Sequence, residues 1–263
     1  MTNQASEIFD IVVLGGGSGG YATALRAAQL GLRTALVEKD KLGGTCLHSG
    51  CIPTKALLHA AEIADSAQHG HSVGVHAVVE KIDVEVLHAF KNATIDRLHS
   101  GLAGLVRSTE NITIVEGYGR LVDAHTVDVD GRRLTGDNLV LATGSSARSL
   151  PGIEIGGRVI TSDEALNLDT IPGRVVVIGG SVIGVEFASA WRSFGTEVTI
   201  VEALPRLVPL EDPTLSKQLE RAFRKRKIAF KTDARVEGVE QREGAAVVRL
   251  ESGDEIEADY VLV

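Results

Sequence analysis

A pattern of strand, glycine-rich turn, helix and second strand occurs twice in this chain and sets its fold class. The first copy begins with the apolar, β-branched run at 8–14, which is typical of a strand buried in a parallel sheet. A G-x-G-x-x-G motif follows, then a helix rich in alanine and leucine, and a second strand that ends at Glu38. The glycines of this motif are Gly15, Gly17 and Gly20. The order of these elements predicts a βαβ unit.

The second copy lies 164 residues further along the chain, as Gly179 does after Gly15. Its turn places Gly179, Ser181 and Gly184 at the three motif positions, and its second strand ends at Glu202. Because strand, turn, helix and acid all keep one spacing, the sequence predicts an α/β protein with two Rossmann-like units.

Each copy has the residue types that a dinucleotide site needs. Glycines permit a tight turn and the close approach of a pyrophosphate to a helix N-terminus. An acidic residue at the end of the second strand can bind the hydroxyl pair of a ribose, so Glu38 and Glu202 are interpreted as ribose ligands. Two such sites imply two cofactors, or one cofactor and one substrate nucleotide. That is the plan of a flavoprotein that exchanges electrons with a nicotinamide.

The second site differs from the first at Ser181, which stands where a glycine allows the phosphates to approach most closely. Serine is small and its backbone amide remains a donor, so binding is expected to survive in a looser form. Both acids suit an unphosphorylated ribose, and NAD is therefore favoured over NADP. Arg206 lies nearby, but the Glu202 carboxylate would repel a 2′-phosphate, so Arg206 is interpreted as a surface residue.

Both cysteines of the chain, Cys46 and Cys51, lie five positions apart, and Lys55 follows four positions after the second. No C-x-x-C pair or histidine cluster completes a four-ligand metal site, so a redox pair is favoured. A straight helix would separate the two cysteines by about 7.5 Å along its axis, too far for a disulfide, and residues 47–50 are predicted to be irregular. A helix starting near Cys51 would favour a thiolate there, as would Lys55. Two unreactive cysteines under a loop are the alternative.

The net charge of −8 over 263 residues argues against a nucleic-acid partner, because such binding depends on a basic surface. Residues 1–10 lack the basic and apolar regions of a secretory signal. No run approaches the roughly 18 apolar residues that a membrane span needs. A cytoplasmic protein without a membrane partner is expected, and a disulfide in that reducing compartment is usually transient and catalytic.

Weaker signals complete each unit with a small antiparallel meander. Between the two glycine-rich motifs we expect a long helix, broken softly at Gly101 and Gly104. We also expect several strands, with a hairpin turn at Asp130-Gly131. The expected ranges are 82–106 for this helix and 112–116, 126–129 and 139–142 for the strands. After the second fingerprint we expect a helix at 212–227 and strands at 235–241, 246–251 and 255–263.

Pro151-Gly152 marks a linker, so 1–150 and 151–263 are expected to form separate units. The chain stops inside the apolar run Tyr-Val-Leu-Val with no polar cap. A natural domain seldom ends there, and the sequence is therefore expected to be cut short.

Residues 43–55 resemble the redox-active centre of the flavoprotein disulfide reductases, the pyridine nucleotide–disulfide oxidoreductase family. The resemblance rests on Gly-Gly-Thr-Cys at 43–46 and on Cys-Ile-Pro-Thr-Lys at 51–55. Together with Val-Ile-Gly-Val-Glu-Phe-Ala-Ser-Ala-Trp at 182–191, these residues are most similar to the dihydrolipoamide dehydrogenases of that family. The His48-Ser49 pair resembles an actinobacterial type rather than the commoner asparagine-containing version. The resemblance covers the whole chain.

The resemblance implies a role for each residue of this centre. Cys46 is similar to the interchange thiol that reacts with dihydrolipoamide, and Cys51 to the thiol that lies against the isoalloxazine of FAD. Lys55 resembles the lysine beside the flavin, and Glu186 the carboxylate that pairs with it. From the sequence alone, a glutamate that reaches solvent by itself is the alternative for Glu186.

The same resemblance assigns the two nucleotide sites, with Glu38 binding the ribose of FAD and Glu202 that of NAD. It divides the chain into a FAD-binding unit at 1–150 and an NAD-binding unit at 151–263. Further nucleotide contacts are implied at Thr45, Lys55, Gly119, Thr143, Gly144, Ser145 and Val236.

The implied reaction is the oxidation of dihydrolipoamide, carried on the lipoyl domain of an acyltransferase, by NAD⁺. Dihydrolipoamide reduces the Cys46–Cys51 disulfide through a mixed disulfide at Cys46, and electrons then pass through the flavin to NAD⁺. A homodimer is implied for the full-length form. The family's second FAD segment and its C-terminal interface domain, which carries a His–Glu acid/base pair, are absent from these 263 residues. Another FAD-dependent disulfide or metal-ion reductase, or a non-catalytic nucleotide-binding fragment, are the alternatives.

Overall fold

The computed structural model describes residues 7–263, so Met1 to Ser6, and with them most of the stretch inspected for a secretory signal, lie outside the described residues. The chain divides into two compact units. The first contains residues up to 52 together with 92–146, and the second contains 53–91 together with 147–263. The chain passes from the first unit to the second after residue 146, near the boundary expected at 150. Residues 53–91, expected in the first unit, group with the second.

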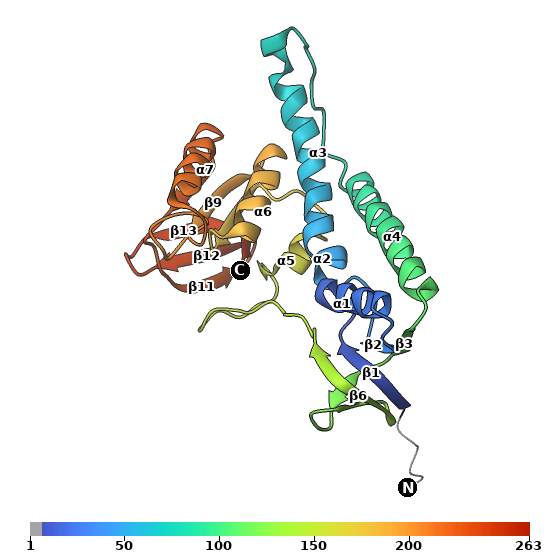
Figure 1. Cartoon of the computed structure of the whole chain (residues 1–263). Coiled ribbons are helices and arrows are strands. Elements are labelled where there is room, and N and C mark those ends of the chain that lie inside the picture. The colour runs from blue at the N-terminus through green and yellow to red at the C-terminus, as the bar shows by residue number, and fades with distance from the viewer. Residues whose placement is uncertain (1–6) are drawn as a thin grey trace. The chain divides into compact units, whose positions relative to one another are not determined.

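The first unit is built on a six-stranded sheet. Its strands are β1 (Glu7–Leu14), β2 (Thr34–Glu38), β3 (Ile112–Glu116), β4 (Gly119–Leu121), β5 (Thr126–Val129) and β6 (Arg132–Leu141). They take the order β3-β2-β1-β6-β5-β4, in which the first four are parallel. These four parallel strands are labelled in Figure 1. Strands β5 and β4 extend the sheet through antiparallel pairings. The helices that begin or end in this unit are α1 (Ser18–Gln29), α2 (Gly44–His48), α3 (Cys51–His69) and α4 (Val84–Ser108).

Strand β1 is central in this sheet and buries side chains on both of its faces. Successive side chains of a strand point to opposite faces. Val12 accordingly packs in a cluster with Val37 and Leu134, while Val13 packs in another cluster with Val106 of α4. Burial on both sides explains why the run at 8–14 is apolar without alternation.

The second unit combines a five-stranded parallel sheet with a three-stranded antiparallel meander. The parallel strands are β7 (Val159–Ile160), β8 (Arg174–Ile178), β9 (Glu197–Val201), β10 (Ala229–Lys231) and β14 (Tyr260–Leu262), in the order β10-β9-β8-β14-β7. The meander contains β11 (Val236–Arg242), β12 (Ala245–Leu250) and β13 (Glu255–Ala258). The helices are α5 (Ser162–Ala165), α6 (Val182–Ser193), α7 (Pro213–Lys225), the 3₁₀ turn η1 (Gly70–Val73), the part of α3 after Ile52 and the part of α4 up to Lys91.

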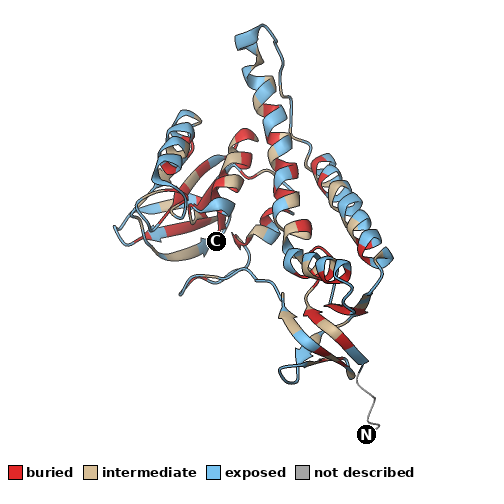
Figure 2. Cartoon of the chain, in the orientation of Figure 1, coloured by how far each residue is buried: buried red, intermediate tan, exposed pale blue. Residues whose placement is uncertain are grey.

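Helix α6 is the centre of the larger core in this unit. Figure 2 shows buried residues along the helix, and they include Phe187 and Trp191, whose rings lie 5.2 Å apart. Leu57 and Ala61 of α3 belong to the same cluster. This apolar contact is the reason that residues 53–91 group with the second unit.

The α/β class with two Rossmann-like units is confirmed, and so are most of the expected strands and helices. The hairpin turn at Asp130-Gly131 is also confirmed, since both residues have positive φ and Val129 pairs with Arg132. The short elements β4, β7, β10 and α5 were not expected. Among residues 7–263, no helix combines the length and apolar character required for crossing a membrane.

The break expected at Gly101 and Gly104 was wrong, because α4 is continuous from Val84 to Ser108. A glycine weakens a helix by only about 1 kcal/mol, and burial of Ala103 and Val106 in the first unit stabilises this stretch.

The irregular segment expected at 47–50 is shorter than predicted. Helix α2 runs to His48, and only Ser49 and Gly50 separate it from α3, which begins at Cys51. Leu47 is buried, and this burial stabilises the additional helical residues.

The strand expected at 255–263 is two strands in different sheets. Strand β13 completes the meander, whereas β14 pairs with β8 and β7 in the parallel sheet. The change of direction occurs at Asp259, whose Oδ2 accepts hydrogen bonds from the amides of Gly173 and Arg174 at 2.8 and 2.9 Å.

Candidate functional site

The first glycine-rich turn connects β1 to α1 and leaves no room for side chains. Gly15 has φ of +106°, which only glycine adopts readily. A Cβ atom on Gly20 would lie 1.7 Å from the carbonyl oxygen of Gly15. The turn and the first amides of α1 therefore form the close-approach cradle that a pyrophosphate requires.

Glu38, at the end of β2, bonds to this turn through backbone amides. Its Oε2 accepts a hydrogen bond from Gly16 N at 2.6 Å, and its Oε1 accepts one from Asp40 N at 2.9 Å. An ionised carboxylate has about four acceptor positions, so both oxygens retain capacity for hydroxyl donors. Glu38 is thus fixed beside the turn, as a ribose ligand must be.

The segment after β6 lies against the same turn. A Cβ on Gly15 would lie 2.2 Å from the carbonyl oxygen of Ala142, and Ala142 N donates to Leu14 O at 2.8 Å. Thr143, Gly144 and Ser145 follow directly as an exposed loop. Ligands of open parallel sheets bind at the carboxyl ends of the strands, where this loop lies. Gly119 opens β4, where a Cβ would lie 2.3 Å from Leu14 Cδ1.

The cysteine segment is attached to this turn. Gly43 N donates to Gly16 O at 2.9 Å, and Gly43 forms a parallel bridge with Gly17. A Cβ on Gly44 would lie 2.6 Å from the Cα of Gly17. Helix α2 then places exposed Thr45 and half-buried Cys46, and Cys51 is the exposed first residue of α3. The first unit therefore brings together the glycine turn, Glu38, the loop after β6 and both cysteines.

The second fingerprint repeats the geometry of the first. Gly179 has φ of +107°, and a Cβ on Gly184 would lie 2.0 Å from Gly179 O. Glu202 Oε2 accepts from Gly180 N at 2.7 Å, and its Oε1 accepts from Leu204 N at 2.8 Å. Exposed Ser181 is the N-cap residue of α6, and its side chain makes no capping hydrogen bond. Its backbone occupies the middle-glycine position.

Arg206 and Val236 are two further residues of the second unit that the sequence analysis singled out. Arg206 was interpreted as a surface residue, but it is half-buried. Its Nη2 donates to Pro209 O at 2.7 Å, while its buried Nε has no partner among the described residues. The half-buried Val236 opens β11 and pairs with Leu250, with its side chain against the core of the meander.

Lys55 and Glu186 form the contact that the resemblance implies. Lys55 Nζ donates to Glu186 Oε1 at 2.7 Å, within the second unit. The two side chains are 57% and 30% exposed, so water screens their attraction and the pair contributes little to stability. Glu186 therefore has a cationic partner, and Lys55 lies one helical turn after Cys51 in α3.

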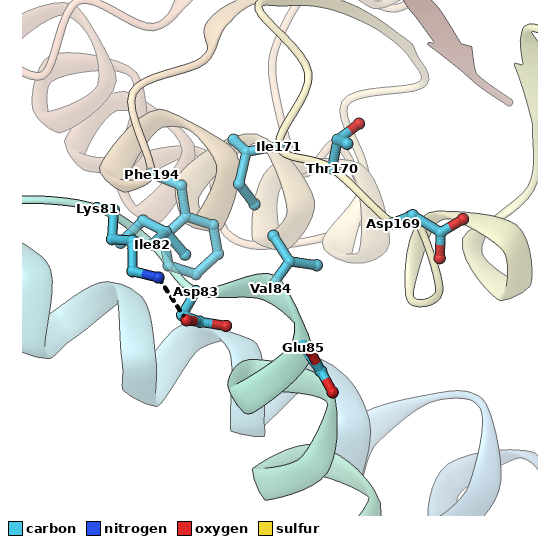
Figure 3. Close-up of a pocket in the computed structure, with 9 residues that line it drawn as sticks. All are labelled: Lys81, Ile82, Asp83, Val84, Glu85, Asp169, Thr170, Ile171 and Phe194. Atoms are coloured by element: carbon cyan, nitrogen blue, oxygen red, sulfur yellow. Dashed lines mark hydrogen bonds and ion pairs between the residues drawn. The ribbon is translucent and has the colours of Figure 1, made fainter.

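One opening in the second unit lies away from these residues. It is lined by 81–85, 169–171 and Phe194, and Lys81 Nζ donates to Asp83 Oδ2 at 2.7 Å at its edge (Figure 3). None of the predicted site residues lines this opening.

Two functional-site neighbours were missed by sequence reasoning. His48 Nε2 lies 2.9 Å from Leu42 O, and its ring contacts that of His99 with centroids 5.1 Å apart. The position of His48 between the two cysteines was a usable signal. His99 gave none, because it lies 51 positions away on a helix with no motif.

The comparisons with known proteins identify the family of the chain. The model of the pyridine nucleotide-disulphide oxidoreductases matches residues 9–263, and the chain belongs to this family. The resemblance seen in the redox motif is thereby confirmed at the level of the family.

Several curated relatives carry the name dihydrolipoyl dehydrogenase. The Bacillus subtilis (strain 168) protein is 42% identical over 242 residues, which cover 87% of this chain and 51% of the relative. The Pseudomonas aeruginosa protein is 41% identical over 266 residues, which cover 96% and 56%. Leghemoglobin reductase of Glycine max is 39% identical over 275 residues, which cover 99% and 52%. The chain spans about half the length of the curated relatives it matches.

Solved structures show the same fold. LpdA from Mycobacterium tuberculosis superposes with a TM-score of 0.87 at 26% identity, covering 97% of this chain and 57% of that one. The Cu(II) complex of the HOCl-induced flavoprotein disulfide reductase RclA from Escherichia coli gives 0.82 at 27% identity, covering 97% and 56%.

Proposed function

We propose that this chain is the FAD- and NAD-binding part of a dihydrolipoamide dehydrogenase. The observation that carries the proposal is the attachment of the Cys46 segment to the first glycine turn, through Gly43 N to Gly16 O at 2.9 Å. A dinucleotide bound at that turn lies beside a pair of cysteines, which is the arrangement a flavin–disulfide enzyme needs. The relatives named dihydrolipoyl dehydrogenase support the choice within the family.

The first unit would hold FAD and the second NAD. Glu38 would accept hydrogen bonds from the ribose of FAD, and Gly15, Gly17 and Gly20 would admit its pyrophosphate. Glu202 would bind the ribose of NAD, with the amide of Ser181 facing its phosphates. Thr45, Gly119, Val236 and the loop 143–145 would add minor contacts. When bound, FAD supplies a two-electron carrier between a dithiol and the nicotinamide.

The cysteines would perform the thiol exchange. A thiolate of dihydrolipoamide attacks Cys46 Sγ, the Cys46–Cys51 bond breaks, and Cys51 leaves as a thiolate. The second thiol of the substrate then attacks its own sulfur in the mixed disulfide, so lipoamide leaves as a disulfide and Cys46 as a thiolate. Two electrons have passed to the protein. Lys55, held by Glu186, places a positive charge one helical turn from Cys51.

Partners and location follow from the same proposal. The substrate is dihydrolipoamide on a lipoyl domain of a 2-oxo acid dehydrogenase complex, the full-length form is a homodimer, and the compartment is the cytoplasm. A Cys46–Cys51 disulfide would explain why both cysteines of this chain lie within six residues.

The test is the absorption spectrum of the FAD-loaded protein. Two-electron reduction by dihydrolipoamide is expected to produce a long-wavelength band from a Cys51 thiolate against oxidised flavin. Cys51→Ser is expected to abolish the band. Cys46→Ser is the matched control and is expected to show it before reduction, because Cys51 then has no sulfur to pair with. A wild-type protein that binds FAD and lacks the band on reduction contradicts the proposal.

A second candidate is a disulfide or metal-ion reductase of another specificity, favoured by the structural similarity to RclA. Turnover of the FAD-loaded protein with dihydrolipoamide and NAD⁺, compared with turnover of NADH with oxidised glutathione or with Cu(II), separates the two. Faster reaction with glutathione or Cu(II) than with dihydrolipoamide selects the second candidate. Binding of both nucleotides without any of these reactions identifies a non-catalytic fragment.

A further inference from the structure

His48 lies between the two cysteines and connects their segment to the core of the first unit. It is the last residue of α2, and its Nε2 lies 2.9 Å from the carbonyl oxygen of Leu42. A carbonyl oxygen only accepts, so Nε2 carries the proton and donates it. Leu42 is buried in the cluster that contains Val13 and Leu36. The hydrogen bond therefore joins the end of the Cys46 helix to a residue buried in the core of the unit.

Helix α2 depends on such side-chain contacts. It has five residues, and a helix of that length is not stable by itself in water. Leu47 provides an apolar contact, since a Cβ on Gly43 would lie 2.3 Å from Leu47 Cδ2. His48 provides the polar contact one residue further on. Cys46 lies in the middle of this helix, so its position follows that of the helix.

His99 of α4 contacts the His48 ring. The two rings meet edge-on at 66°, with centroids 5.1 Å apart. Ala103 and Val106 of α4 are buried in the same cluster as Leu42, so both supports of the His48 ring are attached to one core.

The surroundings of His99 favour its neutral form. Burial holds the pKa of His99 below its ordinary value, and the neighbouring His48, Lys41 and Arg107 lower the pKa further, against the opposing effect of Asp96. His99 therefore remains uncharged near neutral pH and does not repel the neighbouring Lys41 and Arg107.

We propose that His48, through its hydrogen bond to the Leu42 carbonyl, is a positioning residue that keeps Cys46 in reach of Cys51, with the edge-on His99 ring as a secondary contact. The inference rests on the proposed function, in which these cysteines form a redox disulfide. A disulfide requires Cα atoms within about 7 Å of each other. A segment that is free to move lowers the effective concentration of one thiol at the other, and the disulfide becomes less stable.

The test measures disulfide stability and requires no turnover. The purified chain is equilibrated with reduced and oxidised glutathione at a series of ratios. In this reaction one S–S bond forms between Cys46 Sγ and Cys51 Sγ, two electrons and two protons pass to oxidised glutathione, and two glutathione thiols are released. Remaining protein thiols are alkylated and counted by mass spectrometry of the intact chain.

Four variants distinguish the effect of the His48 hydrogen bond from the effect of the contact between the His48 and His99 rings. His48→Phe retains a ring and removes the donor, whereas His48→Gln retains a donor four bonds from Cα and removes the ring. His48→Ala removes both. His99→Phe preserves the ring contact without a titratable group.

The equilibrium constant for disulfide formation is expected to fall roughly three- to tenfold in His48→Phe and His48→Ala, the effect of one lost hydrogen bond. A tenfold fall corresponds to a rise of about 30 mV in reduction potential. His48→Gln and His99→Phe are expected to stay within about twofold of the wild type. Should His48→Ala fail to fold, as judged by circular dichroism, the comparison of the Phe and Gln variants decides.

The inference is overturned if His48→Phe matches the wild type, or if His48→Gln falls as far as His48→Phe. A wild-type chain that forms no Cys46–Cys51 disulfide at any glutathione ratio refutes the proposed function, and this inference with it. The two failures are distinguishable, because the first leaves the wild-type disulfide intact.

Discussion

The carboxylates of Glu38 and Glu202 bind the same backbone positions in the two turns. Each accepts a hydrogen bond from the amide of the second residue of its glycine motif, Gly16 or Gly180, and another from the amide two residues after itself. Charge-assisted hydrogen bonds of this kind are about twice as strong as neutral ones. These acids therefore stabilise the turns in addition to the ribose role predicted for them.

At the scale of single residues, His99 makes stability depend on pH. Its pKa is lowered by burial and by nearby cations from the ordinary value of 6.5, so the unfolded chain takes up a proton at a higher pH than the folded chain does. Stability is expected to fall as the pH drops below about 6.5, and to stop falling for this reason once the folded state is also protonated.

His99→Phe is expected to flatten this dependence between pH 7 and pH 5, in urea unfolding followed by circular dichroism. His76→Phe, at an exposed position, is the control and should retain the wild-type slope. An unchanged slope in His99→Phe would show that other groups cause the acid sensitivity.

At the scale of elements, the strand–turn–helix connection tolerates no side chain at Gly20. Gly20→Ala places Cβ 1.7 Å from Gly15 O, so the turn must open or the helix must move. We expect FAD binding at least about tenfold weaker, since roughly 1.4 kcal/mol of strain suffices for that loss. Titration with FAD, followed by flavin fluorescence, measures the effect.

Gly19→Ala is the matched control for this substitution. Its Cβ would meet Ala142 Cβ at 3.9 Å, an ordinary contact, and alanine favours the helix over glycine. Retained FAD binding in Gly19→Ala with loss in Gly20→Ala is the expected result. Equal affinity in both variants would contradict the cradle geometry described for the first turn.

At the scale of the whole molecule, parts distant in sequence are joined within the second unit by Arg226. Its guanidinium donates to Ser189 Oγ at 2.6 Å, to Ser193 Oγ at 2.7 Å and to Asp65 Oδ2 at 3.2 Å. Asp65 belongs to α3 and the two serines to α6. This network reinforces the apolar contact that groups α3 with the second unit.

Arg226→Lys is expected to lower the free energy of unfolding of the second unit by about 1–3 kcal/mol, because one ammonium cannot replace the several donors of a guanidinium. Trp191, the only tryptophan, is 4% exposed in that core, so its fluorescence in urea reports on this unit alone. Arg224→Lys is the control. Its single ion pair, with Glu220, involves an arginine side chain that is 63% exposed, so a loss below about 1 kcal/mol is expected. If both variants lower the free energy of unfolding equally, the hydrogen-bond network of Arg226 does not stabilise the second unit more than an ordinary ion pair does.

The local structure around the two glycine-rich turns could be predicted from the sequence. The turns at Gly15 and Gly179, the strands before them and the acids after them are determined by residues close together in the chain, where backbone sterics and side-chain alternation act directly. Their agreement with the structure extends to the hairpin at Asp130-Gly131.

The sequence by itself determined the fold class, both glycine-rich turns and the close spacing of the two cysteines. Only the tertiary structure decided that residues 53–91 group with the second unit, that β14 leaves the meander, and that His48 contacts His99. These contacts join residues from separate elements whose packing depends on shape and burial in three dimensions. No short sequence pattern predicts such packing, because it depends on which elements come together in the folded chain.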